Sequence, residues 1–295
     1  MNDALVAQSG YVFSGTALVV MAGVSLLGAC AGMVGTFAVL RRRALTGDAL
    51  AHATLPGLCV AVLLVGGRDL SAMLVGAFAA GLVGIGVIAA LRRWTRVKED
   101  AAIGIVLSVF FGVGIVLNSV IQRSRVAGDS SGLQDYIFGH AASLLERDVY
   151  QIGALAVVCT VIVALLYKEF QLLSFDPGFA KAQGWPNWRL DFGMMALIAA
   201  AVVLGLPAVG VVLMAALLIL PGVTARLWTD RLHRLLPLAA FFGALTGALG
   251  TALSARFQGL PAGPIITLVG TGLFVISVVI APKRGLIVRM TRAVS

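Results

Sequence analysis

One stretch of this 295-residue sequence brings an acid and an imidazole together, GDALAHATLPG at positions 47–57. Asp48 and His52 are four residues apart, so on a helix they lie on one face. A carboxylate with an imidazole suits a divalent first-row metal, and a cation at membrane depth needs negative charge nearby. Pro56 has no amide hydrogen to bond the carbonyl of His52, so a backbone oxygen is freed beside the pair. The stretch therefore predicts transient ligands for a metal ion.

A purely structural role for the pair remains an alternative. Asp48 lies five residues after Arg43, so it could cap its helix and pair with that arginine and its neighbours. His52 could be a hydrogen-bonded interior histidine. Against this, ionisable residues inside a membrane are functional by default.

The elements that must position the pair are membrane-spanning helices. The chain is 60% hydrophobic and 12% charged, against about 45–50% and 25% in soluble domains. This composition excludes a water-soluble enzyme, a nucleic-acid-binding protein and a disordered scaffold. A crossing needs about 20 mostly apolar residues. The predicted spans are 13–40, 49–66, 71–91, 101–121, 150–167, 191–206, 208–226, 235–254 and 262–281.

We therefore expect an all-α polytopic membrane protein with about nine transmembrane helices in a single domain, residues 1–295. Only Leu206 and Pro207 separate the sixth span from the seventh. Eight spans with one re-entrant element is the alternative.

The positive charges are distributed unevenly over the connections between these spans. Of the 22 lysines and arginines, 17 fall on alternate connections, beginning with Arg41–Arg43, and five fall on the others. An excess of Lys and Arg marks cytoplasmic loops. The split predicts an N-terminus outside the cell, a cytoplasmic C-terminus and an odd number of spans.

The cytoplasmic connection 168–190 is predicted to contain a short helix of about seven residues. Asp176 is a suitable N-cap, Pro177 suits the first helical position, and Gly184 can end the helix. Such a helix is too short to be stable alone, so its apolar side chains favour docking to a partner. Lipid-surface binding is the alternative. The residues of this surface are Phe175, Asp176, Pro177, Phe179, Lys181 and Gly184.

Motifs for nucleotide binding are missing from the sequence. It has no G-x-x-x-x-G-K-[ST] and no dinucleotide fingerprint, so energy from ATP must come from another chain. His140 is isolated in the outer connection 122–149, where a structural or solvated role is favoured over a ligand role.

Five motifs in order resemble those of the ABC-3 permeases, the membrane subunits of ATP-binding cassette importers for manganese, zinc and iron. The resemblance runs nearly end to end. The motifs are RRRALTGDALAHATLPG at 41–57, KEDAAIGIVLSVFFGVGIVL at 98–117, FGHAASLLERDV at 138–149, SFDPGFAKAQG at 174–184 and VGVVLMAALLILPGVTARL at 209–227.

This resemblance implies a permease of the bacterial inner membrane, paired with itself or with a related permease. It implies two cytoplasmic ATPase subunits, which use the ATP, and an extracytoplasmic solute-binding protein. It places Asp48 and His52 on the metal path and makes residues 176–184 a coupling helix. His140 departs from the family pattern and leaves open a contact with metal at the outer entrance.

We therefore predict a non-enzymatic permease for a divalent metal, manganese before zinc or iron, with no permanently bound cofactor and no nucleic-acid partner. A permease for a metal chelate such as a siderophore is the first alternative. An ATP-independent secondary transporter or channel is the second, although no paired broken helices in two repeat halves are found. An intramembrane enzyme is the third, but it lacks a nucleophile at depth.

Overall fold

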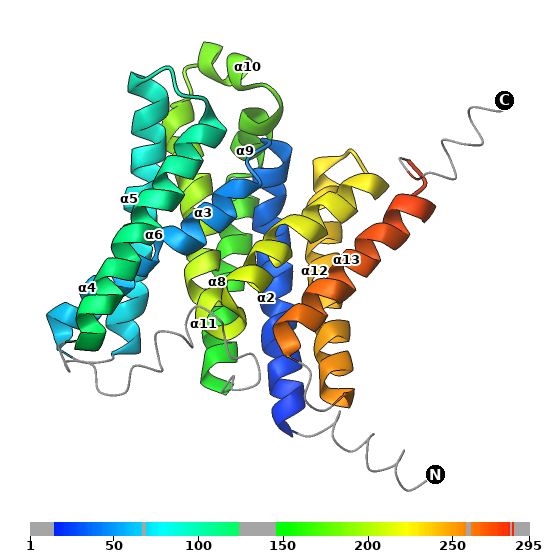
Figure 1. Ribbon diagram of the computed structural model, residues 1–295. Helices are drawn as coiled ribbons and strands as arrows, with labels where there is room; N and C mark the ends of the chain where they lie inside the picture. The colour runs from blue at the N-terminus through cyan, green and yellow to red at the C-terminus, as the bar shows by residue number, and fades with distance from the viewer. Residues whose placement is uncertain (1–14, 67–68, 124–145, 258–260, 284, 286–295) are drawn as a thin grey trace, which may run out of the picture.

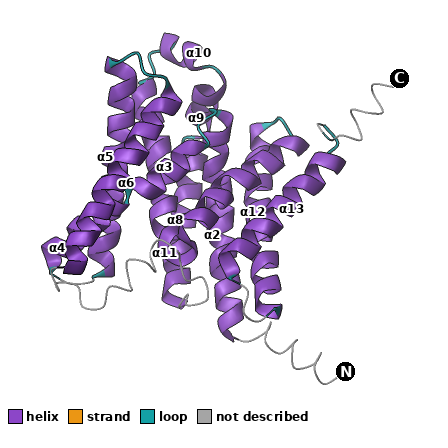
Figure 2. Cartoon of the chain, viewed as in Figure 1, coloured by secondary structure: helices purple, strands orange, loops and turns teal. Residues whose placement is uncertain are grey.

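The computed structural model describes residues 15–66, 69–123, 146–257, 261–283 and 285, and every regular element among them is a helix (Figure 2). Eight helical stretches among these residues are long and apolar enough to cross a membrane, one of which, Leu45–Val65, is interrupted by a turn at Thr54. The prediction of an all-helical polytopic membrane protein is thereby confirmed. The helices are α2 (Gly15–Leu40), α3 (Leu45–Ala53), α4 (Leu55–Val65), α5 (Leu70–Trp94), α6 (Glu99–Arg123), α8 (Glu146–Leu165), α9 (Tyr167–Phe175), α10 (Pro177–Ala182), α11 (Asn187–Trp228), α12 (Leu232–Arg256) and α13 (Ala262–Ile280).

The long helices run back and forth along the bundle (Figure 1). The ends of α2, α5 and α13 and the beginnings of α6, α11 and α12 lie at the end of the bundle that carries α10. We call this the α10 end. Connections that lie far apart in the sequence therefore meet on one side of the molecule.

The break between the sixth and seventh predicted spans was expected at Leu206 and Pro207, and this position is wrong. Pro207 lies inside α11, and the backbone leaves the helical region at Gly210, where φ is 77° and ψ is 169°. Pro207 only removes one backbone hydrogen bond from the helix. Gly210 can adopt a backbone conformation that is open essentially to glycine alone, so the helix breaks there. The two halves of α11 approach each other closely at the break, since a Cβ on Gly205 would collide with Met214. The single apolar helix α11 thus consists of two halves that match the sixth and seventh predicted spans.

Replacing Gly210 with alanine is expected to lower the free energy of unfolding by about 1–3 kcal/mol, the usual cost of such a strained backbone conformation. Thermal unfolding of the purified protein in detergent measures the loss. Gly193→Ala is the matched control because it lies in the same helix with open space around its Cβ position. Equal melting temperatures for the two variants would contradict this account of the break.

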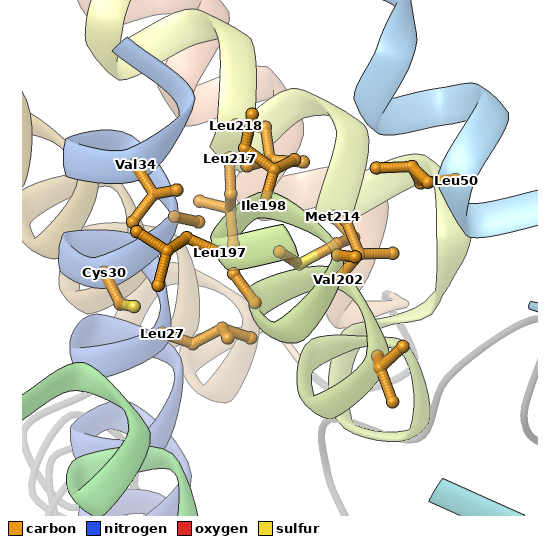
Figure 3. Packing of buried hydrophobic residues seen from close by; sticks show 14 of the residues in the cluster. Leu27, Cys30, Val34, Leu50, Leu197, Ile198, Val202, Met214, Leu217 and Leu218 are labelled. Carbon is orange, nitrogen blue, oxygen red and sulfur yellow. The ribbon is translucent and has the colours of Figure 1, made fainter. Parts of the chain in front are cut away.

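The main hydrophobic core lies where α2 packs against both halves of α11 and against α12. Figure 3 shows Leu27, Cys30 and Val34 of α2 facing Leu197 and Ile198 of α11. At the crossing of α2 with α12, a Cβ added to Gly28 would collide with the backbone of Gly243, and the reverse also holds. Small residues at this spacing let helix backbones approach closely.

A smaller hydrophobic cluster holds α3 in place. Ala49 and Ala53 of α3 pack with Ile88 of α5 and with Ala102 and Val106 of α6. The opposite side of α3 packs on α11 through Leu50, which belongs to the main core (Figure 3). The helix that carries Asp48 and His52 is therefore fixed between α5, α6 and α11.

Candidate functional site

Asp48 and His52 lie on α3, which runs obliquely from the α10 end toward the middle of the bundle (Figure 1). The helix is interrupted at Thr54, and Pro56 occupies the first turn of α4. This is the break expected from a proline in that position. The hydroxyl of Thr54 donates a hydrogen bond to the carbonyl oxygen of Ala51 over 2.7 Å, which satisfies one acceptor at the break.

The structure brings the two predicted ligands together. Nε2 of His52 lies 3.8 Å from Oδ1 of Asp48, and the side chains are 26% and 38% exposed, respectively. This distance leaves the two groups adjacent without a tight hydrogen bond between them. Both can therefore turn toward a shared cation.

One side of the imidazole is covered by apolar groups. The ring of Phe111 on α6 meets His52 edge to face, with 4.9 Å between ring centroids. A narrow pocket beside His52 is also lined by Leu58 of α4 and by Leu206 and Val211 from the two sides of the break in α11. The candidate site thus lies where the broken helix α3–α4, α6 and the broken helix α11 meet.

The structure does not support the alternative in which Asp48 caps its helix and pairs with the arginines that follow the first span. Arg41 and Arg43 bind Asp191 instead, and Asp48 makes no capping hydrogen bond to α3. The acid is four residues into its helix, one turn past the usual capping position. Its carboxylate therefore remains available to a ligand.

Asp48 and His52 form a pair rather than a complete cage. Within the described ranges, no group of three or more His, Cys, Asp and Glu side chains comes together. His140 lies outside the described residues. The pair can offer one carboxylate oxygen and one imidazole nitrogen, a set that suits manganese, iron and zinc alike.

The short helix predicted in the connection 168–190 is present as α10, with six residues. The side chain of Asp176 accepts a hydrogen bond from the amide of Phe179 over 2.9 Å, and Pro177 begins the helix. Gly184 has the positive φ, 81°, that ends it. Phe175 and Phe179 are each about half exposed, so α10 presents apolar side chains at the surface.

A family model for the ABC 3 transport family matches residues 15–281, which include α3, α10 and both halves of α11. The chain belongs to the ABC 3 transport family. Eight apolar helices lie within the part of the chain that the structure describes, and this ABC 3 protein is a multi-pass protein of the inner membrane.

Two curated relatives of this ABC 3 chain are membrane components of metal transport systems. The manganese transport system membrane protein MntC of Bacillus subtilis is 46% identical over 273 residues, 92% of this chain. The chain spans only 62% of the length of that relative. The zinc transport system membrane protein TroC of Treponema pallidum is 45% identical over 92% of this chain and 91% of its own length.

A solved structure resembles the whole ABC 3 chain. PsaBC from Streptococcus pneumoniae in complex with a Fab aligns with a TM-score of 0.83, 28% sequence identity and full coverage of both chains. The fold described above is therefore found in an experimentally determined relative.

One feature of this ABC 3 chain was not predicted from its sequence, a cluster of five charged side chains at the α10 end. It unites Arg41 and Arg43, which follow α2, with Arg92 of α5, Glu99 of α6 and Asp191 of α11. Burial lowers the pKa of Arg41 from its ordinary value, and neighbouring Asp191 acts in the opposite direction. We call these five residues the arginine cluster. In the sequence, the arginine cluster is marked only by charged residues that stand at or beside the ends of the predicted spans.

Proposed function

We propose that this chain is the permease subunit of an ATP-binding cassette importer for a divalent transition metal, manganese before zinc or iron. Asp48 and His52 are its transient ligands. The observation that carries the proposal is their juxtaposition on α3, a short helix that ends in a break at Thr54, in a chain whose relatives are named for manganese and zinc transport. ATP is bound and hydrolysed by a partner subunit.

The incomplete ligand set supports transport over storage. An ion held by a complete protein cage leaves slowly, whereas conduction requires binding that is weak enough to release the ion. Two protein ligands that keep the ion partly hydrated meet this requirement. The pair would therefore accept a metal from one side of the membrane and release it to the other as the bundle alternates between outward-facing and inward-facing states.

The exposure of Asp48 supports a path shared by two permease chains. Its side chain is 38% exposed in the single chain, and a carboxylate facing hydrocarbon is costly. A second copy, or a related permease, would enclose Asp48 within a watery path. An extracytoplasmic binding protein would deliver the metal to it.

The distribution of charge supports a cytoplasmic position for the α10 end. Arg43, Arg92, Lys181 and Arg231 all lie in or beside connections at that end, as expected of cytoplasmic loops. The N-terminus would then lie outside and the C-terminus inside. The ATPase would meet the permease at α10.

Replacing Phe179 with alanine is expected to weaken ATPase binding at least about tenfold, because an aromatic anchor in an interface contributes about 2 kcal/mol or more. Co-purification of the tagged permease with its ATPase measures the loss. Phe257→Ala is the matched control, since both side chains are 51% exposed. Phe257 directly follows α12, at the end of that helix opposite the α10 end. Equal ATPase retention by the two variants would contradict docking at α10.

Deletion of the gene, followed by measurement of total cell metal by mass spectrometry, tests the proposed function. We expect one divalent transition metal to fall and to return when the chain is supplied together with its ATPase. If free metal did not restore growth whereas a chelate did, the chelate permease would replace this proposal. Full restoration in a strain without the ATPase would favour a secondary transporter.

A further inference from the structure

The arginine cluster is built around one nearly buried side chain. Arg43 is only 5% exposed, and its Nη1 lies 2.6 Å and 2.8 Å from the two carboxylate oxygens of Asp191. Its Nε contacts Oε1 of Glu99. One guanidinium therefore binds two carboxylates from different helices. Such charge-assisted, multidentate hydrogen bonds are stronger and more directional than neutral ones.

The remaining arginines complete the cluster. Arg41 lies 2.8 Å from Asp191, and Arg92 lies 3.1 Å from Glu99 and 3.8 Å from Asp191. Three cations thus surround two anions. Each carboxylate contacts at least two of the arginines, and Arg43 at the centre is nearly buried, so the five side chains are expected to act as a unit.

The helices joined by the cluster are the ones that form the candidate metal site. Arg43 directly precedes α3, which carries Asp48 and His52. Glu99 begins α6, whose Phe111 contacts His52. Asp191 lies in the first turns of α11, which also supplies Leu206 to the pocket beside His52.

The same cluster lies next to α10 along the chain. Nδ2 of Asn187 donates a hydrogen bond to the carbonyl oxygen of Pro177 over 2.8 Å, so the start of α10 is fastened to the start of α11. Asp191 follows Asn187 by one helical turn. A displacement of α10 would therefore move Asp191, and Asp191 would carry Arg43 with it.

We propose that Arg43, Asp191 and Glu99 are positioning residues that transmit movement of α10 to α3 and α6, and so to Asp48 and His52. This inference rests on the proposed function, because it names the joint between the ATPase surface and the metal site. Apolar side chains can slide past one another during such a movement. A guanidinium that binds two carboxylates on different helices holds them in a fixed relative position, so it transmits a displacement better than an apolar contact does.

The test uses the complete assembly in proteoliposomes, with ATPase subunits inside and Mn²⁺-loaded binding protein outside. Uptake of radioactive Mn²⁺ and release of phosphate are measured in the same vesicles. Asp191→Asn keeps the shape of the side chain and removes its charge. We expect uptake per ATP hydrolysed to fall about tenfold, within the usual range of coupling effects, while hydrolysis continues. Arg43→Lys keeps the charge but replaces the planar guanidinium with a single nitrogen that cannot hold the two carboxylates in the same geometry, so it should give a smaller fall in the same ratio.

Lys283→Gln is the control, because it breaks an exposed ion pair with Asp230, 3.3 Å long, that involves neither α3 nor α6. Its ratio of uptake to hydrolysis should match that of the unmodified chain. The inference is overturned if uptake and hydrolysis fall in parallel in Asp191→Asn and Arg43→Lys, if neither variant assembles, or if the ratio is unchanged. Failure of the proposed function is distinguishable, since the unmodified assembly would then take up no Mn²⁺ at all.

Discussion

Replacing Asp48 with asparagine, or His52 with alanine, is expected to reduce Mn²⁺ uptake at least about a hundredfold. Loss of groups that only support metal ligands already costs about 10–100-fold in affinity or activity, and these two side chains are the proposed ligands themselves. Asparagine has the shape of aspartate, so Asp48→Asn removes the charge with little change in packing. Uptake of radioactive Mn²⁺ by cells that express the importer measures the effect.

The control for this prediction is Asp100→Asn, which neutralises an exposed aspartate in the first turn of α6. It should leave uptake unchanged. The amount of each variant in the membrane is determined in parallel, and we expect it to match the unmodified protein. Normal uptake by both Asp48→Asn and His52→Ala would remove the pair from the mechanism.

Replacing Gly243 with valine is expected to destabilise the protein by about 3 kcal/mol or to prevent folding. A Cβ at this position would collide with the backbone of Gly28, which has no flexible side chain that could move aside. The α2 and α12 helices would have to separate, and overpacking a tight core usually costs about 1–3 kcal/mol even where side chains can adjust. Thermal unfolding in detergent and the yield of folded protein are the measurements.

Gly272 offers a matched control on the neighbouring helix α13. A Cβ at Gly272 meets nothing within 4 Å, so Gly272→Val should keep a melting temperature close to that of the unmodified protein. A melting temperature for Gly243→Val equal to that of Gly272→Val would refute the close crossing of α2 and α12.

Much of the fold was predictable because each local signal depends on few residues. An apolar run long enough to cross a membrane has almost no alternative to a helix. The predicted spans agree with the observed helices except that the sixth and seventh form the single broken helix α11. Asp176, Pro177 and Gly184 were sufficient to predict α10, because capping and termination are set by neighbours in the chain. The spacing of Asp48 and His52 likewise predicted one shared helix face.

The features that sequence reasoning missed depend on long-range packing. A proline in an apolar run signals a break, but the turn occurs at Gly210, where the positive φ allows the two halves of α11 to reverse. Arg43 and Asp191 are 148 residues apart, and nothing local identifies them as partners. The spacing placed Asp48 beside His52 but could not show that the neighbouring Arg41 and Arg43 bind Asp191 instead of Asp48.

The most direct test of a metal importer is ATP-dependent uptake of radioactive Mn²⁺ into proteoliposomes that contain the chain, its ATPase subunits and its binding protein. We expect Mn²⁺ to accumulate only when ATP is present, with competition from free Zn²⁺ or Fe²⁺ and with little uptake when Asp48 is replaced by asparagine. Uptake without ATP, or uptake of a metal chelate but not of free metal, would contradict the account.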